Sequence, residues 1–288
     1  MENLTDIRTI KAVIARHGFT FSKGLGQNFL TDESVPEQIA EESLVDENTG
    51  AVEIGPGIGT LTASLCKRAK KVVAVELDKR LLPVLADTMA DYDNFKVINA
   101  DALKTDFAKL IEEEMTGLRP VLCANLPYYI TTPIITSLLE SKAPFETMTF
   151  MVQKEVAQRI CASPASKAYG AITAMVQYYS RAEMLFDVPA SSFIPAPKVD
   201  SAVVKLTVYK QPPFQVRSAE NMFRLVKASF AQRRKTLVNA LLGGLGGGFS
   251  KQQIEQAITA IGFDTNIRGE CLSIEDFGRL SDVLYEKK

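Results

Sequence analysis

The sequence contains only one histidine, four cysteines and no tryptophan among its 288 residues. A single histidine excludes a metal site built from several histidines. A Ser-His-Asp triad would have to use His17, which no nucleophile motif accompanies, so we interpret it as an ordinary residue at a helix end. The cysteines stand at Cys66, Cys123, Cys161 and Cys271. They are far apart and form no CxxC pair, so we expect inert structural thiols in a reducing compartment and no metal.

Long apolar runs and an excess of charge are also missing. No stretch suits a signal peptide or a membrane span, so we expect no membrane partner and place the protein in the cytoplasm. The net charge is −1, which argues against a uniformly basic surface but allows a local basic patch for nucleic acid. The hydrophobic fraction of 46% is ordinary for a globular protein with a core.

The main structural signal is an alternation of strands and helices after two N-terminal helices, expected at 4–16 and 33–43. Short β-branched segments predict strands at 51–54, 71–76, 95–98, 121–124 and 147–152, with helices between them and from residue 154. This order predicts the α/β class, with a mostly parallel sheet covered by helices on both faces. Segments 182–188 and 201–209 are expected to be antiparallel neighbours that close the sheet.

The segment Gln211-Pro212-Pro213 breaks the chain and marks a domain boundary. We expect a catalytic domain at 1–210 and a small all-helical domain at 211–288. The glycine run at 243–248 follows a helix rather than a strand, so we interpret it as a flexible connector and not as a phosphate loop.

A glycine-rich turn, 53–59, follows the first of these strands and opens a helix. Glycines at such a turn let a ligand approach the backbone, where a Cβ would clash. The turn fits both NAD and S-adenosylmethionine (SAM) binders. The GxGxG spacing and an acidic residue two positions before Gly55 favour SAM.

Polar residues end the next strands. Glu76 ends the second strand and is expected to accept hydrogen bonds from both ribose hydroxyls of an adenosine. Asp101 ends the third strand and is placed to accept from the adenine amino group of the cofactor. Since ligands bind at the carboxyl ends of parallel strands, Gly55, Glu76, Asp101 and Asn125 are expected to form one site.

The motif Asn125-Leu126-Pro127-Tyr128 follows the fourth strand and indicates the reaction. The adenine N6 lone pair is delocalised into the ring, and it becomes nucleophilic if acceptors hold its two hydrogens. The Asn125 amide oxygen and the Leu126 carbonyl are candidates for these acceptors. Pro127 would fix the turn, and Tyr128 would stack on the flipped base. No general base is required, because the proton can leave after methyl transfer.

Two further features complete the sequence-based hypothesis. Phe193, in a proline-stiffened loop between the last two strands, could form the other wall of the base pocket, although its spacing fits a core residue equally well. Residues 210–235 contain seven basic residues and one acid. Within them the segment 229–235 is expected to lie on a helix and to follow RNA phosphates. The candidate RNA-binding residues are Arg224, Lys227, Arg233, Arg234 and Lys235.

Over essentially its whole length the chain resembles the small-subunit (16S) rRNA adenine dimethyltransferases. The residues that carry this resemblance lie at 24–30, 55–59, 125–128, 153–156, 193–201 and 230–235. The resemblance implies a seven-stranded, Rossmann-like class I methyltransferase domain and a small helical C-terminal domain. The implied SAM-binding residues are Asn28, Leu30, Gly55, Gly57, Glu76, Asp101 and Asn125.

The resemblance also implies a substrate. Two adjacent adenosines in a hairpin loop near the 3′ end of 16S rRNA would each receive two methyl groups, within an immature small subunit. We also expect the enzyme to be a monomer. Three alternatives remain open. A 23S rRNA methyltransferase of the macrolide-resistance type fits the motifs, although Leu126, the chain length and the proline-rich loop disfavour it. An NAD-dependent oxidoreductase leaves 125–128 unused. An assembly factor acting mainly by binding needs the same surface.

Overall fold

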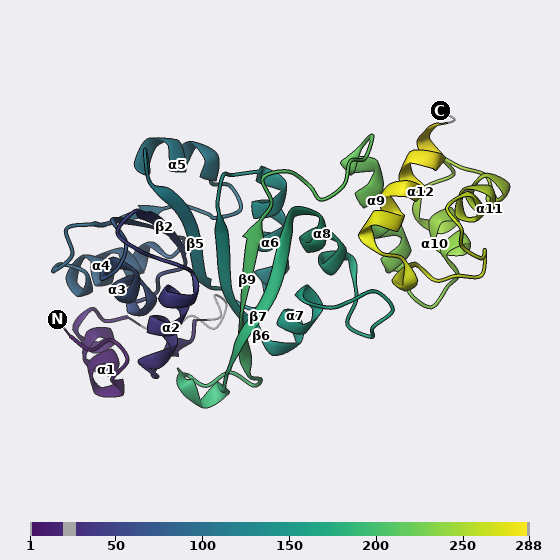
Figure 1. Ribbon diagram of the computed structural model, residues 1–288. Coiled ribbons are helices and arrows are strands. Elements are labelled where there is room, and N and C mark those ends of the chain that lie inside the picture. The colour runs from purple at the N-terminus through teal and green to yellow at the C-terminus, as the bar shows by residue number, and fades with distance from the viewer. Residues whose placement is uncertain (1, 20–26, 287–288) are drawn as a thin grey trace. The chain divides into compact units, whose positions relative to one another are not determined.

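The computed structural model describes residues 2–19 and 27–286, and its elements are labelled in Figure 1. The chain divides into two compact units. The first comprises residues 1–157 and 182–208, and the second comprises residues 158–181 and 209–288. Within the described residues, no helix combines the length and apolar character that crossing a membrane requires.

The first unit is built on a seven-stranded sheet with the order β4-β3-β2-β5-β6-β9-β7. Its strands are β2 (Thr49–Ile54), β3 (Lys71–Glu76), β4 (Phe95–Asn99), β5 (Arg119–Asn125), β6 (Thr147–Gln153), β7 (Ser180–Val188) and β9 (Ser201–Val208). Strands β4 to β6 run parallel, and β9 pairs antiparallel with β6. The mostly parallel sheet and the adjacency of the last two strands are therefore confirmed.

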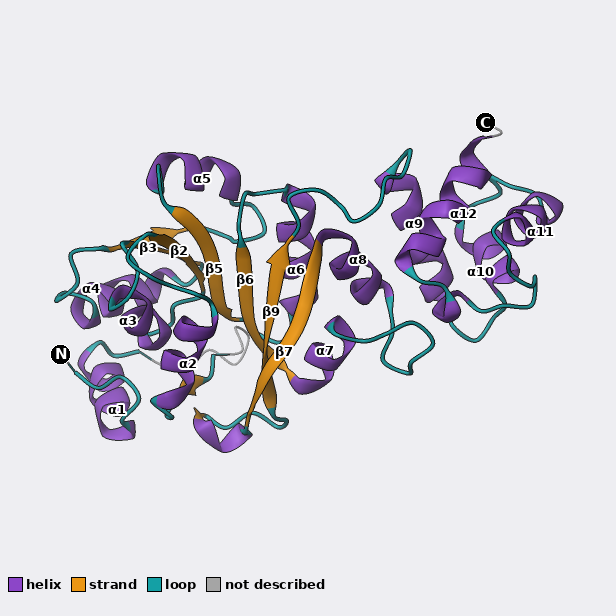
Figure 2. Cartoon of the chain, viewed as in Figure 1, coloured by secondary structure: helices purple, strands orange, loops and turns teal. Residues whose placement is uncertain are grey.

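Helices cover the sheet on both faces, as the alternation predicts. The helices up to residue 160 are α1 (Ile7–Arg16), α2 (Ser34–Glu42), α3 (Thr60–Cys66), α4 (Leu82–Thr88), α5 (Phe107–Glu114), α6 (Thr131–Ser141) and α7 (Lys154–Ile160). In Figure 2, α2 and α3 lie on the near side of the strands and α6 on the far side. Every residue of β2 is buried, because this strand is central and covered on both faces.

The first helix begins later than its apolar spacing predicts. Asp6 caps it by accepting a hydrogen bond from the Thr9 backbone N–H at 3.1 Å, so the helix starts at Ile7 rather than at Leu4. Ile7 is 44% exposed, whereas Leu4, which precedes the cap, is buried. His17 occupies the C-cap, and its Nε2 lies 2.8 Å from the Asp87 carboxylate of α4.

The second unit contains the C-terminal helices α9 (Ala219–Ala231), α10 (Leu237–Gly244), α11 (Lys251–Ala260) and α12 (Ile274–Glu286). It also contains α8 (Ala171–Tyr179). The partition therefore differs from an expected division at residues 210 and 211. The segment 158–181 groups with the later helices because Tyr178 packs edge-on against the rings of Phe214 and Phe223.

The glycine run at 243–248 is only partly a connector. Gly243 and Gly244 belong to α10, and a Cβ on Gly244 would lie 2.6 Å from the Ala228 Cβ of α9. The absence of a side chain at this position thus lets the two helices pack closely. Only the end of the run, including Gly246 and Gly247 with their positive φ angles, forms a turn.

Candidate active site

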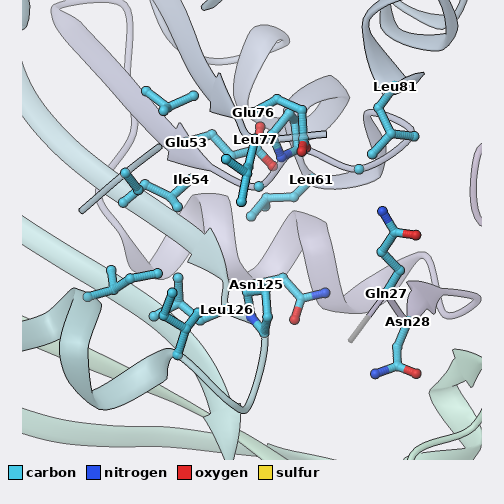
Figure 3. Close-up of a pocket in the computed structure, with 18 of the residues that line it drawn as sticks. Gln27, Asn28, Glu53, Ile54, Leu61, Glu76, Leu77, Leu81, Asn125 and Leu126 are labelled. Carbon is cyan, nitrogen blue, oxygen red and sulfur yellow. The ribbon is translucent and has the colours of Figure 1, made fainter. Parts of the chain in front are cut away.

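A pocket opens at the carboxyl ends of β2, β3 and β5 and encloses about 1100 Å³, including its solvent-filled mouth. Figure 3 shows side chains from these strand ends and from the segment after residue 26 arranged around it. It is lined by ten of the eleven residues expected to bind cofactor or target base: Asn28, Leu30, Gly55, Gly57, Glu76, Asp101, Asn125, Leu126, Pro127 and Tyr128. Segments up to 100 positions apart in the sequence therefore meet at one edge of the sheet.

The glycine turn shapes one side of the pocket. Gly55 has a φ of +73°, Gly57 has a φ of +61°, and both are in the left-handed region that favours glycine. A Cβ built on Gly55 would meet no atom within 4 Å, so the space beside it is open to a ligand. A Cβ on Gly57 would instead lie 3.2 Å from the ring of Phe29, so this glycine also accommodates the segment that carries Asn28 and Leu30.

Glu76 presents a buried carboxyl group at the end of β3, with 6% of the residue exposed. Its Oε1 accepts a hydrogen bond from the Asp78 backbone N–H at 2.7 Å. Burial raises the pKa of Glu76 to about 7. The Asp78 and Gly57 backbone N–H groups lower it, and the Asp78 carboxylate raises it further. The carboxyl group is thus held in place and titrates near neutral pH.

Asp78 connects Glu76 to the N-terminal part of the site. Its carboxylate makes two hydrogen bonds with the Arg80 guanidinium, at 2.8 and 2.6 Å, and accepts another from Gln27 at 3.2 Å. The Arg80 guanidinium carbon lies 5.3 Å from the centre of the Phe19 ring. The described residues on both sides of 20–26 are therefore fixed to the strand end that carries Glu76. The glycines Gly24 and Gly26, which contribute to the sequence resemblance, lie outside the described residues.

Glu53 is the most deeply buried acid of the pocket wall, with 1% exposure. Among the residues that the structure describes, its Oε2 has no hydrogen-bond partner. Burial raises the pKa of Glu53 to about 8, the Thr62 hydroxyl lowers it, and the Glu76 carboxyl raises it. Two neighbouring acids with raised pKa values therefore lie at this wall of the pocket. Clusters of this kind are enriched at functional sites.

Asp101 lies at the pocket after β4, with 31% of its side chain exposed. Its Oδ1 accepts a hydrogen bond from the Leu103 backbone N–H at 2.9 Å, and this bond orients the carboxylate. The adjacent Asn99 side chain donates to the carbonyl of Glu76 at 2.8 Å and so ties the ends of β3 and β4 together.

The segment 125–128 is held at three points. The Leu126 N–H donates to the Met151 carbonyl at 3.1 Å, and the Pro127 carbonyl accepts from the Ile130 N–H at 3.2 Å. The Tyr128 hydroxyl lies 2.7 Å from the Ser201 hydroxyl. Among the described residues, no hydrogen bond involves the side-chain amide of Asn125 or the carbonyl oxygen of Leu126. The backbone is thus fixed, while the two expected acceptors stay available at the pocket.

Tyr128 is half-buried, and burial raises its pKa above the ordinary value, while the Ser201 hydroxyl lowers it and the Asp200 carboxylate raises it. Its phenol is therefore protonated at neutral pH. A neutral ring with an anchored hydroxyl is a suitable surface for a stacked base.

Phe193 is placed differently from the expectation. It does not line the pocket, and its side chain, 5% exposed, packs in the core with Leu30 and Val203. The reason is a short antiparallel pair between β1 (Phe29–Leu30) and β8 (Phe193–Ile194), in which Phe193 lies opposite Leu30. Phe193 therefore supports the segment that carries Leu30 and offers no free ring face to a base.

The candidate RNA-binding side chains are all exposed. The segment 229–235 was expected to lie on a helix, but residues 232–235 are not helical. Helix α9 ends at Ala231, and Arg233, Arg234 and Lys235 lie in the turn before α10. Arg233 is also engaged within its own unit, donating to the Glu270 carboxylate at 2.9 Å and to the Lys167 carbonyl at 3.1 Å.

Sequence reasoning did not assign a site role to several residues that line the pocket. They are mainly apolar or amide side chains: Gln27, Glu53, Leu61, Leu77, Leu81, Tyr129, Ile130 and Ile134. Glu53 belongs to the 53–59 turn, Gln27 belongs to the 24–30 segment, and Tyr129 directly follows the 125–128 motif, so these positions were the signal available in the sequence. The others have no chemistry that distinguishes them from core residues.

Comparisons with known proteins agree with this geometry. The sequence profile described as "Ribosomal RNA adenine dimethylase" matches residues 18–284. The chain is 50% identical over 276 residues to ribosomal RNA small subunit methyltransferase A of Geobacillus thermodenitrificans, covering 95% of this chain and 94% of the relative.

Two solved structures are similar as well. A dimethyladenosine transferase from Plasmodium falciparum has a TM-score of 0.70 and 26% identity, covering 87% of this chain and 95% of that one. The 23S rRNA methyltransferase ErmE has a TM-score of 0.66 and 26% identity, covering 89% and 99%. With a pocket of this construction and a profile that matches nearly the whole chain, the protein belongs to the ribosomal RNA adenine dimethylase family of methyltransferases.

Proposed function

We propose that the protein uses SAM to dimethylate N6 of two adjacent adenosines near the 3′ end of 16S rRNA in an immature small ribosomal subunit, acting as a monomer. The observation that carries the proposal is that one pocket contains both the Gly55–Glu76–Asp101 edge and the 125–128 turn. Both sets of residues line this one pocket, so a cofactor and a target base would meet there.

The residues present fit SAM. The open space beside Gly55 admits a ligand against the backbone, and the buried Glu76 carboxylate suits the ribose hydroxyls. Asp101 would accept from the adenine amine, while Asn28 and Leu30, on the segment packed against Gly57, would close the neighbouring side. The buried Oε2 of Glu53 has no partner in the described part of the chain, so it leaves an acceptor at the pocket wall. When bound, SAM supplies an electrophilic methyl group on a positively charged sulfur.

The chain's own residues activate the target amine. Asn125 Oδ1 and the Leu126 carbonyl would accept the two N6 hydrogens, which localises the nitrogen lone pair and directs it out of the ring plane. Tyr128 would stack on the extruded base, and its bond to Ser201 fixes the ring before the base arrives. Such preorganised acceptors stabilise charge that develops on the amine during transfer. The proton leaves after transfer, so no base is assigned.

The exposed Arg224, Lys227, Arg233, Arg234 and Lys235 would contact RNA phosphates in this proposal. Neutralised phosphates release counterions, so binding through these residues would weaken as salt rises. We assign them a shared electrostatic role and no base specificity.

The test uses labelled SAM with small and large ribosomal subunits from a strain that lacks adenine methylation, followed by nucleoside mass spectrometry. Dimethyladenosine in the small subunit alone supports the proposal, and the Asn125→Ala variant should abolish it. Label in the large subunit would favour the 23S activity named for ErmE. An Asn125→Ala protein that binds immature subunits and blocks their maturation would favour a role in assembly by binding and release.

A further inference from the structure

Tyr129 is a large aromatic side chain that the proposed reaction leaves without a role. It lines the pocket, yet it is 57% exposed, which makes it one of the most exposed large apolar residues of the described chain. Its neighbour Leu126 is 1% exposed and Tyr128 is half-buried. The side chains of this turn therefore run from the interior of the pocket to its mouth, and Tyr129 stands at the mouth.

The turn holds Tyr129 in place. The Pro127 carbonyl accepts hydrogen bonds from the Ile130 N–H at 3.2 Å and from the Thr131 hydroxyl at 3.1 Å, so both ends of the turn that contains Tyr129 are fixed. Among the described residues, the Tyr129 hydroxyl has no hydrogen-bond partner. The ring is thus presented to solvent on a rigid support and is not anchored through its polar end.

Extruding the target nucleotide disrupts base stacking next to the pocket mouth. Removing a base from its stack costs free energy and leaves the neighbouring base with an uncovered face. The phosphodiester chain keeps that neighbour close to the entrance while the target occupies the pocket. An aromatic ring there can restore the lost stacking, and it can do so for any base because every base has a π face.

We infer that Tyr129 is a stacking platform for the nucleotide that flanks the target adenosine, forming a second base subsite at the pocket mouth. This inference rests on the proposed function, in which the flanking nucleotide is the second target adenosine. Tyr129 would then hold one adenosine at the mouth while the other is methylated. It would contribute to recognition of the RNA without contacting the cofactor.

The first test compares Tyr129→Ala and Tyr129→Phe with the wild type on unmethylated small subunits. Loss of one base–aromatic stack should lower kcat/KM for the subunit by about 10- to 100-fold in Tyr129→Ala. Tyr129→Phe keeps the ring and should stay within about 2- to 3-fold of the wild type. SAM affinity should be unchanged in both variants. Tyr209→Ala, which removes an exposed tyrosine outside the pocket, is the matched control.

The second test removes the flanking base. Small subunits are reconstituted with rRNA that carries an abasic nucleotide on the 5′ or the 3′ side of a single target adenosine. On one side, the wild type should lose about as much activity as Tyr129→Ala loses on intact RNA. The two changes together should cost no more than either alone, because they remove the same contact.

The outcomes separate this inference from the proposed function. If the wild type methylates small subunits and Tyr129→Ala matches it, the inference is wrong and the function stands. If Tyr129→Ala is impaired but its defect adds in full to that of an abasic neighbour on either side, Tyr129 contacts something other than a flanking base. If the wild type does not methylate small subunits, the proposed function fails first.

Discussion

The buried carboxyl group of Glu53 allows a direct test of the electrostatics of the pocket through the Glu53→Gln variant. The residue is 1% exposed, and its Oε2 has no hydrogen-bond partner within residues 2–19 and 27–286. Burial first, and then the Glu76 carboxyl, raise its pKa from 4.5 to about 8. Between these values the carboxyl is protonated in the folded protein and ionised in the unfolded chain.

The sign of the effect follows from proton linkage. Over this pH range the unfolded state binds fewer protons than the folded state, so the free energy of unfolding falls as the pH rises. One pKa unit corresponds to about 1.4 kcal/mol. Between pH 5 and 8.5 the wild type should lose on the order of 2–4 kcal/mol relative to Glu53→Gln, whose amide does not ionise.

The assay is urea unfolding of the ligand-free protein at pH 5, 7 and 8.5, followed by circular dichroism. The midpoint of Glu53→Gln should exceed that of the wild type by about 1 M at pH 8.5, with little difference at pH 5. Glu114→Gln is the control. The Lys71 and Lys96 ammonium groups lower the pKa of Glu114, so its loss should cost the same at all three pH values. An equal difference between wild type and Glu53→Gln at pH 5 and 8.5 would refute the reasoning.

Three further predictions concern the cofactor, the base and helix packing. SAM affinity, measured by calorimetry, should fall about 10-fold or more from pH 7.5 to 5.5. Burial raises the pKa of Glu76 to about 7, so protonation over this range removes a ribose acceptor. Glu76→Gln should bind SAM weakly and show no such pH dependence. Tyr128→Phe, which loses the bond to Ser201 but keeps the ring, should lower kcat by about 3- to 10-fold, and Tyr128→Ala by at least 100-fold, with SAM affinity within 2-fold in both. Gly244→Ala should lower the free energy of unfolding, measured by calorimetry, by about 1–3 kcal/mol, because the added Cβ would lie 2.6 Å from that of Ala228. Adding Ala228→Gly to this variant should restore most of the loss. An unchanged Tm in Gly244→Ala would contradict the close helix contact.

The sequence alone determined the features that depend on local pattern and on the order of elements. Alternating strands and helices specify a parallel sheet, because parallel neighbours need crossover connections. Residues that follow each strand must meet at one edge, so the convergence of Gly55, Glu76, Asp101 and Asn125 could be predicted without coordinates. The 125–128 motif likewise indicated methylation of an aromatic amine, because such an amine becomes nucleophilic only when acceptors hold its hydrogens.

Tertiary structure decided the features that depend on contacts between distant segments. Phe193 fits both a pocket wall and a core position by spacing, and its pairing with Leu30, more than 160 positions away, placed it in the core. Asn28 was implied only by resemblance, because a two-residue strand carries no periodicity that could locate it at the pocket.

The burial of side chains and the positions of helix ends also depend on tertiary structure. The raised pKa of Glu53 depends on how completely the surrounding segments exclude water, which no local pattern reports. The end of α9 at Ala231 moved Arg233 and its neighbours into a turn, and the packing of Gly244 against Ala228 made two glycines of an apparent connector helical. Local sequence therefore specified which groups gather at the site, whereas long-range packing determined which of them are buried, anchored or exposed.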